Sequence, residues 1–230
     1  MKYLMKPLPL IVILILSLPS LAQHITFTGG LNVSDMEVKY GEVTTDIEKS
    51  YKMKPGFHVG MLVDLIIYKK INTFISVEPG LLFDMKGVDQ DAIENESDFT
   101  QINKFNLYYL DIPILVKYQH RFRNLNKLYF GVGPYIGAGL LGKKEYTYAI
   151  INGENQTKFV DVKWGFDSKE DDMKRFDYGV SAKVGFLFDG GLNCSVSYDY
   201  GIPNVAAASH IKTYKHRLIR LSAGYYLKFD

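Results

Sequence analysis

The stretch Phe74-Ile75-Ser76-Val77-Glu78-Pro79-Gly80-Leu81-Leu82-Phe83-Asp84-Met85-Lys86 decides the fold of this 230-residue chain. Apolar side chains recur at every second position, which is the period of a β-strand. The opposite face carries Glu78, Asp84 and Lys86. If such a strand crosses a membrane, its apolar face must meet lipid, because a Lys or Arg facing the middle of the bilayer costs roughly 2 to 4 kcal/mol. The stretch therefore predicts a transmembrane strand whose charges face a barrel lumen.

Seven further segments show the same alternation. They are His24–Ser34, Phe57–Ile67, Phe105–Gln119, Lys127–Leu140, Phe176–Phe188, Leu192–Gly201 and Arg217–Phe229. The connections between segments are alternately long and short: the short ones are 68–73, 120–126 and 189–191, and the long ones are 35–56, 87–104, 141–175 and 202–216. In outer-membrane barrels the short turns are periplasmic and the long loops extracellular. The sequence thus predicts an all-β fold, an eight-stranded antiparallel up-and-down transmembrane β-barrel.

Three prolines, Pro79, Pro113 and Pro134, fall inside these segments. Proline has no backbone N–H to donate to a neighbouring strand, so we expect bulges or local gaps in the ladders there. The alternative is that one segment is broken into two, which would give an odd or larger strand number.

The first 22 residues combine a basic start, an apolar run from Leu8 to Leu21, and the small residues Ser20 and Ala22 before Gln23. This pattern is typical of a cleaved secretory signal peptide, with a retained transmembrane helix as the alternative. It assigns residues 1–22 to the signal peptide and 23–230 to the outer-membrane β-barrel domain. The chain would then reside in the cell outer membrane.

Composition narrows the function classes. The chain has 27 Lys and Arg and 25 Asp and Glu, and removal of Lys2 and Lys6 with the signal peptide leaves 25 of each. A formally neutral chain gives no indication of nucleic-acid binding. The single cysteine, Cys194, excludes internal disulfides and thiolate metal clusters. The 17 Tyr and 14 Phe against one Trp are an aromatic share typical of membrane-interface girdles.

The inward-facing positions of the eight segments carry six acids and five bases. They are Asp64, Glu78, Asp84, Asp111, Asp177 and Asp199, with Lys86, Lys117, Lys183, Arg220 and Lys228. The interior of an eight-stranded barrel is just wide enough for side chains to fill, and buried charges need partners because their desolvation is costly. We expect these charges to pair into a structural plug of salt bridges. A narrow or gated channel and a ligand-binding lumen are the alternatives.

Two other kinds of site, a hydrolase site at the barrel rim and a calcium loop, have weaker support in the sequence. A hydrolase at the barrel rim needs an Asp or Ser beside a His, but no spacing motif selects a pair from the residues near the predicted extracellular side, which are His58, His210, His216, Asp35, Asp84, Asp177 and Ser209. The acidic loop 87–104 lacks the ligand spacing of a known calcium motif, so we expect a solvated loop. No catalytic, cofactor or metal site is predicted.

The longest connection contains Asn152-Gly153 between two β-prone runs. An Asn-Gly pair in this setting favours a hairpin, which would stand above the membrane. The alternative is that the flanking strands simply extend past the bilayer.

Six blocks of the sequence resemble the small outer-membrane β-barrel proteins of Bacteroidetes that are labelled PorT-like. The blocks are Gly29–Ser34, Gly56–Gly60, Glu78–Gly87, Tyr109–Lys117, Gly131–Gly137 and Leu221–Leu227. The resemblance covers essentially the whole mature chain and implies an outer-membrane barrel. The PorT label further implies a role in the type IX secretion apparatus. The aromatic-rich end with Phe229 resembles the insertion signal of the barrel-assembly machinery, although Asp230 follows it.

These observations predict a protein with a structural or adhesive, loop-mediated binding role. Its expected partners are outer-membrane lipid, the barrel-assembly machinery during insertion, and another envelope protein or a surface ligand through the long loops. The alternatives are an accessory subunit of a secretion (type IX-like) or envelope assembly complex and, third, a narrow channel or rim-located hydrolase.

Overall fold

The computed structural model describes residues 24–40, 51–90, 93–94, 100–149, 155–167, 169–207 and 211–228. The predicted signal peptide, residues 1–22, lies outside these ranges, as do Asn152-Gly153, Ser209, His210, Phe229 and Asp230. Among the residues that the structure describes, no helix is long and apolar enough to cross a membrane.

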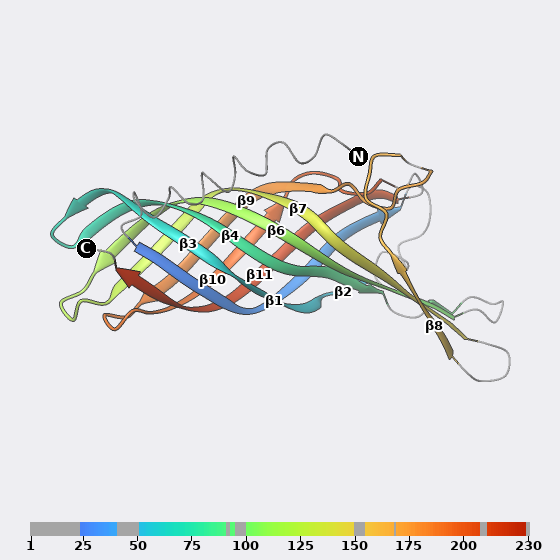
Figure 1. The fold of residues 1–230 in the computed structure, drawn as a ribbon, viewed down its shortest axis with the longest axis horizontal. Helices are drawn as coiled ribbons and strands as arrows, with labels where there is room; N and C mark the ends of the chain where they lie inside the picture. Colours follow the sequence, from blue (N-terminus) through green and yellow to red (C-terminus); the bar gives the residue numbers. More distant parts are fainter. Residues whose placement is uncertain are drawn as a thin grey trace.

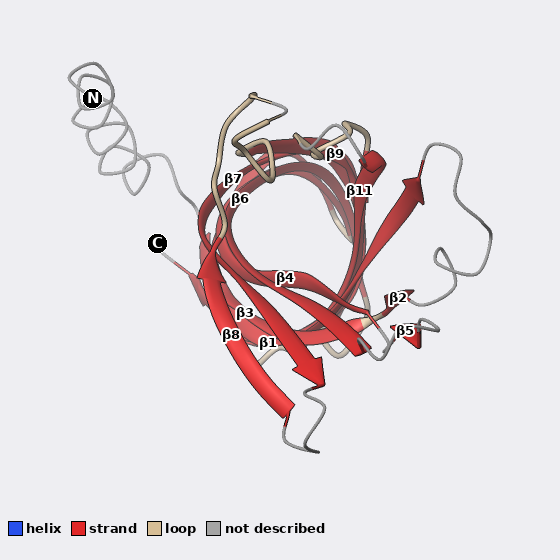
Figure 2. Ribbon diagram, turned by 90° about the vertical axis from the view of Figure 1, so that its right-hand side faces the viewer, coloured by secondary structure: helices blue, strands red, loops and turns tan. Residues whose placement is uncertain are grey.

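Eight long strands form one closed barrel. They are β1 (His24–Tyr40), β3 (Lys54–Lys70), β4 (Thr73–Gln90), β6 (Thr100–Arg121), β7 (Lys127–Ala149), β9 (Phe176–Leu187), β10 (Leu192–Gly201) and β11 (Ile211–Lys228). Each pairs antiparallel with the next along the chain. β1 also pairs with β11, from His24 opposite Lys228 to Tyr40 opposite Ile211, and this pairing closes the ring seen end-on in Figure 2. The predicted eight-stranded up-and-down barrel is confirmed, and none of the predicted segments is broken in two.

Three shorter strands lie at the long-loop end. β2 (Tyr51–Lys52) pairs with β4, β5 (Ile93–Glu94) with β6, and β8 (Asn155–Asp161) with β7. The β7–β8 ladder runs from Lys143 opposite Asp161 to Ala149 opposite Asn155, so the predicted hairpin is confirmed, although its tip lies outside the described residues. β7 also runs nine residues past the predicted end at Leu140. Figure 1 shows this hairpin projecting from the end opposite the short turns.

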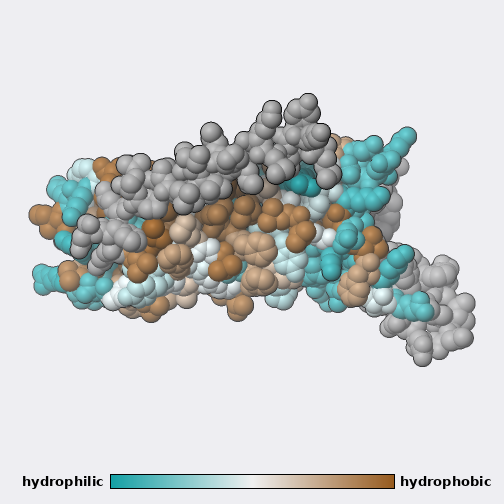
Figure 3. All heavy atoms as spheres, in the orientation of Figure 1, coloured by the Kyte–Doolittle hydropathy of each residue, from teal (hydrophilic) through white to brown (hydrophobic). Residues whose placement is uncertain are grey.

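The strands expose their apolar faces and bury their polar ones. Phe27, Phe130 and Leu221 are among the large apolar side chains that point outward and are exposed. On the face seen in Figure 3, apolar residues form a band around the middle of the barrel, with hydrophilic residues at both ends. Such a band is stable only against lipid, which is why the period-two pattern of the sequence fixes the inside and outside of every strand.

The prolines interrupt the ladders on one side only, because the missing N–H affects a single neighbouring strand. Each proline keeps a partner on its other side: Pro79 with Ile114, Pro113 with Tyr135, and Pro134 with Val180. The ladders have gaps beside Pro79 on β3, beside Pro113 on β4 and beside Pro134 on β6. The expected local gaps are therefore confirmed.

Candidate functional site: the barrel lumen and its two ends

Four charged side chains form the first of two ion-pair groups in the lumen, which we call the periplasmic-side cluster: Asp64, Glu78, Lys117 and Lys183. Lys117 Nζ lies 2.5 Å from Glu78 Oε2 and 2.9 Å from Asp64 Oδ2. Lys183 Nζ lies 2.8 Å from the other oxygen of Glu78. All four side chains are buried. Two acids face two bases, so the cluster is formally neutral.

Polar and aromatic side chains complete this cluster. Gln119 donates hydrogen bonds to Asp64 (3.0 Å) and to the Ser76 hydroxyl (2.9 Å). The ammonium groups of Lys117 and Lys183 lie 4.9 and 5.6 Å from the centroid of the Tyr129 ring, and the Tyr129 hydroxyl donates to Asn193 (2.8 Å). These contacts supply partners beyond the ion pairs, which buried charges require.

The periplasmic mouth is covered by an aromatic ring with cations above it. Phe74 is buried. The Arg121 guanidinium lies 5.4 Å and the Lys127 ammonium 4.5 Å from its ring centroid. Lys127 also lies 5.8 Å from the ring of Tyr226, whose hydroxyl points to Asp64 at 3.5 Å. The aromatic cover is thus continuous with the periplasmic-side cluster.

The second group, the extracellular-side cluster, consists of Asp84, Asp111, Asp177, Asp199, Lys86 and Arg220. Arg220 binds Asp84 with two parallel hydrogen bonds, Nε to Oδ1 at 2.7 Å and Nη2 to Oδ2 at 2.9 Å. Its other contacts are Nη1 to Asp199 (2.6 Å) and Nη2 to Asp111 (3.0 Å). Bidentate pairing of this kind is strong and directional. One guanidinium therefore joins three carboxylates from three different strands.

Lys86 is the second base of this cluster. Its Nζ lies 2.8 Å from Asp111 and 3.5 Å from Asp177. It also lies 4.6 and 5.4 Å from the ring centroids of Tyr109 and Tyr135. Since four acids face two bases, the cluster has a formal charge of −2, and all six side chains are buried.

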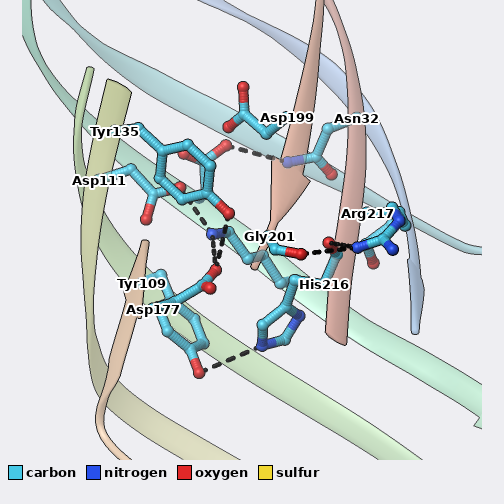
Figure 4. A network of polar contacts seen from close by, with 12 residues as sticks. Asn32, Tyr109, Asp111, Tyr135, Asp177, Asp199, Gly201, His216 and Arg217 are labelled. Atoms are coloured by element: carbon cyan, nitrogen blue, oxygen red, sulfur yellow. Dashed lines mark hydrogen bonds and ion pairs between the residues drawn. The ribbon is translucent and has the colours of Figure 1, made fainter. Parts of the chain in front are cut away.

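Tyr135, Tyr109 and His216 add hydrogen bonds beside this cluster, and Figure 4 shows them next to Asp111 and Asp177. The Tyr135 hydroxyl donates to Asp177 at 3.0 Å, and Tyr109 meets His216 at 3.3 Å. The Asp111 carboxylate occupies the space that a Cβ at Gly137 would need, so a larger residue at 137 would displace it. The sequence did not single out Tyr109 or His216 as cluster members. The signal was present, because strand alternation places both on inward faces.

A small cavity lies between the two clusters. Its volume is about 20 Å³, and its lining includes His58, Glu78, Lys183, Arg220 and Ser222. A volume of this size holds about one water molecule. The middle of the lumen is therefore filled by side chains, as expected for eight strands.

Two connecting segments lie at the extracellular end of the lumen, and the structure describes residues 162–167, 169–175 and 202–207 of them. Isolated bridges join Trp164 to Met173 and Met173 to Ala206. These segments pack with Val88, Leu107, Tyr109 and Tyr214 in an apolar core. The Trp164 ring meets Tyr109 edge-on at 5.7 Å and occupies the space that a Cβ at Gly139 would need. We call this structure the cap; no pattern in the sequence predicts it.

The histidines lie in the lumen and not at an open rim, which corrects the expectation for His58 and His216. His58 is buried, with Nε2 2.9 Å from the Ser222 hydroxyl. A serine–histidine–acid relay needs a carboxylate on the other imidazole nitrogen, but His58 Nδ1 has no hydrogen-bond partner, and both oxygens of nearby Asp84 bind Arg220. The adjoining 20 Å³ cavity leaves no room for a substrate.

The remaining predicted site residues are placed as follows. Lys228 lies on β11 opposite His24, but its side chain is outside what the structure describes. Asp89 from the acidic loop pairs with Lys54 at 2.6 Å, whereas Asp91, Glu96 and Asp98 lie outside the described residues. Within the described ranges, no three His, Cys, Asp or Glu side chains are grouped so that they could hold a metal ion.

Comparison with protein families assigns the chain to a family. The family described as outer membrane protein beta-barrel domain matches residues 20–207. The chain belongs to this family. The predicted outer-membrane location is thereby confirmed, and the lipid-facing band of the barrel fits it. The match supports the coarser part of the resemblance drawn from the sequence, while the PorT-like subgroup stays a prediction.

Solved structures with a similar fold are small outer-membrane proteins. Ail, the attachment invasion locus protein of Yersinia pestis, is 13% identical, with 90% of this chain and 99% of Ail covered and a TM-score of 0.35. OprG from Pseudomonas aeruginosa is 11% identical, with 90% and 97% covered and a TM-score of 0.44. Neisserial surface protein A is 13% identical, with 89% and 97% covered and a TM-score of 0.38. No curated protein matches the chain.

Proposed function

We propose that this protein is a closed, non-enzymatic outer-membrane barrel that works through its extracellular surface, in a structural or adhesive role. The observation that carries the proposal is the filled lumen: two buried ion-pair clusters lie in it with a cavity of only about 20 Å³ between them. The buried Phe74 ring lies at one end and the cap at the other. A hydrated ion needs a continuous water-filled path, and these side chains occupy it. The clusters then serve as a structural plug.

The extracellular end offers a surface for binding. β8 extends the barrel wall above the membrane by pairing with β7, and β5 pairs with β6 at the same end. Phe159 on β8 and Phe166 in the cap are 62% and 74% exposed. These two exposed rings are available for contact with a partner at this end. We infer that the partner is another envelope protein or a surface ligand.

Conductance in planar bilayers tests the plug. The purified mature protein should give no stable current steps, while a porin inserted in the same bilayers serves as the positive control. Stable, sizeable channels would contradict the plug and would favour the channel alternative.

Site-specific photo-crosslinking in intact outer membranes tests the surface. A photoreactive residue at Phe159 should give discrete adducts, whereas the same residue at Val116, an exposed lipid-facing position on β6, should not. The absence of adducts at Phe159 would contradict a binding role for β8.

The accessory-subunit alternative predicts a different pattern. The lipid-facing wall has a shallow hollow of about 630 Å³ where the small residues Gly29, Ala223 and Cys194 lie on neighbouring strands. A membrane-embedded partner of a secretion or assembly complex would contact this wall. Adducts from a photoreactive residue at Leu31, which lines the hollow, together with none at Phe159, would favour that function.

A further inference from the structure

The short-turn end of the barrel carries an excess of cations. Lys69 and Lys70 end β3, Arg121 ends β6, Arg123 lies in the following turn and Lys127 begins β7. We call these five residues the basic rim. Within the described residues of this end, the turn acid Asp189 is the one carboxylate outside the lumen. The whole chain, by contrast, has 27 bases and 25 acids.

The basic rim is one continuous surface. β4 pairs with β6 up to Thr73 opposite His120, which places the two turns side by side at the left of Figure 1. The Arg121 backbone N–H donates to the Asn72 carbonyl at 2.7 Å, and its guanidinium donates to the Ile71 carbonyl at 2.5 Å. These bonds hold the rim cations of both turns on a shared, ordered backbone.

Three of the rim cations have no acidic partner. Lys69, Lys70 and Arg123 are exposed, and none forms an ion pair with a described residue. In the lumen every described base contacts a carboxylate, so the rim differs from the interior in this respect. Exposed cations without partners are available to an anionic ligand.

An aromatic group adjoins the rim and sets its depth in the membrane. The Phe122 and Phe186 rings stack with centroids 6.2 Å apart, and Phe186 meets Phe188 at 4.9 Å. Aromatic side chains of a barrel gather at the membrane–water interface. Since Phe122 lies between Arg121 and Arg123, an interfacial position of these rings would place the rim cations at the level of the lipid headgroups.

We propose that the basic rim binds the phosphate groups of anionic phospholipids in the periplasmic leaflet. Arginine can hold a phosphate through two parallel N–H donors, and lysine contributes a point charge on a flexible stem that reaches the headgroup region. The position of the rim beside the lipid-facing aromatic group favours lipid over an acidic periplasmic protein. A lipid preference here is independent of what the extracellular surface binds.

A measurement of selective lipid binding tests the proposal. The protein is reconstituted in phosphatidylcholine vesicles with or without phosphatidylglycerol, and bound phosphatidylglycerol is measured by native mass spectrometry after extraction. The preference for phosphatidylglycerol should fall about five-fold for each rim cation removed in Lys69→Gln, Lys70→Gln and Arg123→Gln. The matched control replaces three exposed extracellular lysines, Lys158, Lys163 and Lys169, by glutamine and should keep the preference.

Further measurements distinguish binding of phospholipid headgroups from binding of free phosphate or of a protein partner. Raising the salt concentration should release phosphatidylglycerol from the unmodified protein, because screening weakens exposed charge contacts. This arm does not depend on the folding of any variant. Equal lipid preference in the rim triple variant, insensitivity to salt, or equal competition by inorganic phosphate would overturn the proposal. Protein adducts from a photoreactive residue at Arg123, without a phosphatidylglycerol preference, would also overturn it and assign the rim to a protein partner.

Discussion

The two charge clusters occupy the same lumen but differ in the ratio of their buried acids to their buried bases. In the periplasmic-side cluster, two carboxylates meet two lysines, and each acid touches at least one lysine. In the extracellular-side cluster, four carboxylates share Lys86 and Arg220. One oxygen each of Asp111, Asp177 and Asp199 has no hydrogen-bond partner among protein atoms, against one oxygen of Asp64 in the periplasmic-side cluster. The difference teaches that charged groups can fill a lumen without equal numbers of acids and bases, and that the two clusters should respond oppositely to loss of an acid.

Replacement of Arg220 should cause the largest loss of stability. Arg220→Met keeps an unbranched side chain but removes the guanidinium from Asp84, Asp199 and Asp111. Only Asp111 then keeps an ion pair, with Lys86. Removing one partner of a buried pair costs about 3 to 5 kcal/mol, and here Asp84 and Asp199 lose their ion-pair partner at once. Urea unfolding in detergent micelles should show a loss at the upper end of this range. Arg123→Met at the exposed rim is the control and should change little; an equal loss in both variants would contradict the assigned role of Arg220.

The corresponding change in the balanced cluster should cost somewhat less. Lys117→Met leaves Asp64 without an ion-pair partner, although Gln119 still donates to it, and leaves Glu78 with Lys183. We expect a loss of about 3 kcal/mol in the free energy of unfolding, from the same rule for broken buried pairs. The second change Asp64→Asn, introduced together with Lys117→Met, should recover part of the loss because it removes the stranded charge. If the double variant is less stable than Lys117→Met, the pairing of these two residues does not limit stability.

The cap lies over the unbalanced cluster and should unfold before the barrel. Trp164 is the only tryptophan of the chain, so its fluorescence reports the cap alone. Trp164→Ala removes the ring from Tyr109 and Gly139 and should cost about 2 kcal/mol, less than a fully buried tryptophan. In the unmodified protein, the Trp164 emission should shift at a lower urea concentration than the loss of β-structure measured by circular dichroism. Coincident transitions would show that cap and barrel form one cooperative unit.

The sequence pattern predicts the strands of the barrel wall far better than it predicts the contacts among the side chains in the lumen. The alternation around Glu78, Asp84 and Lys86 suffices to decide strand, face and membrane side, because period and charge are local properties. The partners of each charge are not local: Arg220 meets acids from β4, β6 and β10, and the strand registers decide which. The cap was missed for a related reason, since Trp164 and Met173 lie in connections that have no periodic pattern. His58 was misplaced because its depth depends on the barrel stagger.

The most specific test of the difference between the two clusters has the smallest expected effect on stability. Asp177→Asn removes one negative charge from the cluster that has two in excess, while Lys86 keeps Asp111 and the Tyr135 hydroxyl can still donate to the amide oxygen. We expect a gain of about 1 kcal/mol in the free energy of unfolding, on the order of one hydrogen-bonded charge contact. Glu78→Gln is the matched change in the balanced cluster and should lower stability, because Lys183 then loses its carboxylate partner. Opposite signs in urea unfolding would establish that local charge balance distinguishes the clusters. A loss in both would mean that Asp177 is held as tightly as Glu78 and that the formal excess is compensated within the extracellular-side cluster.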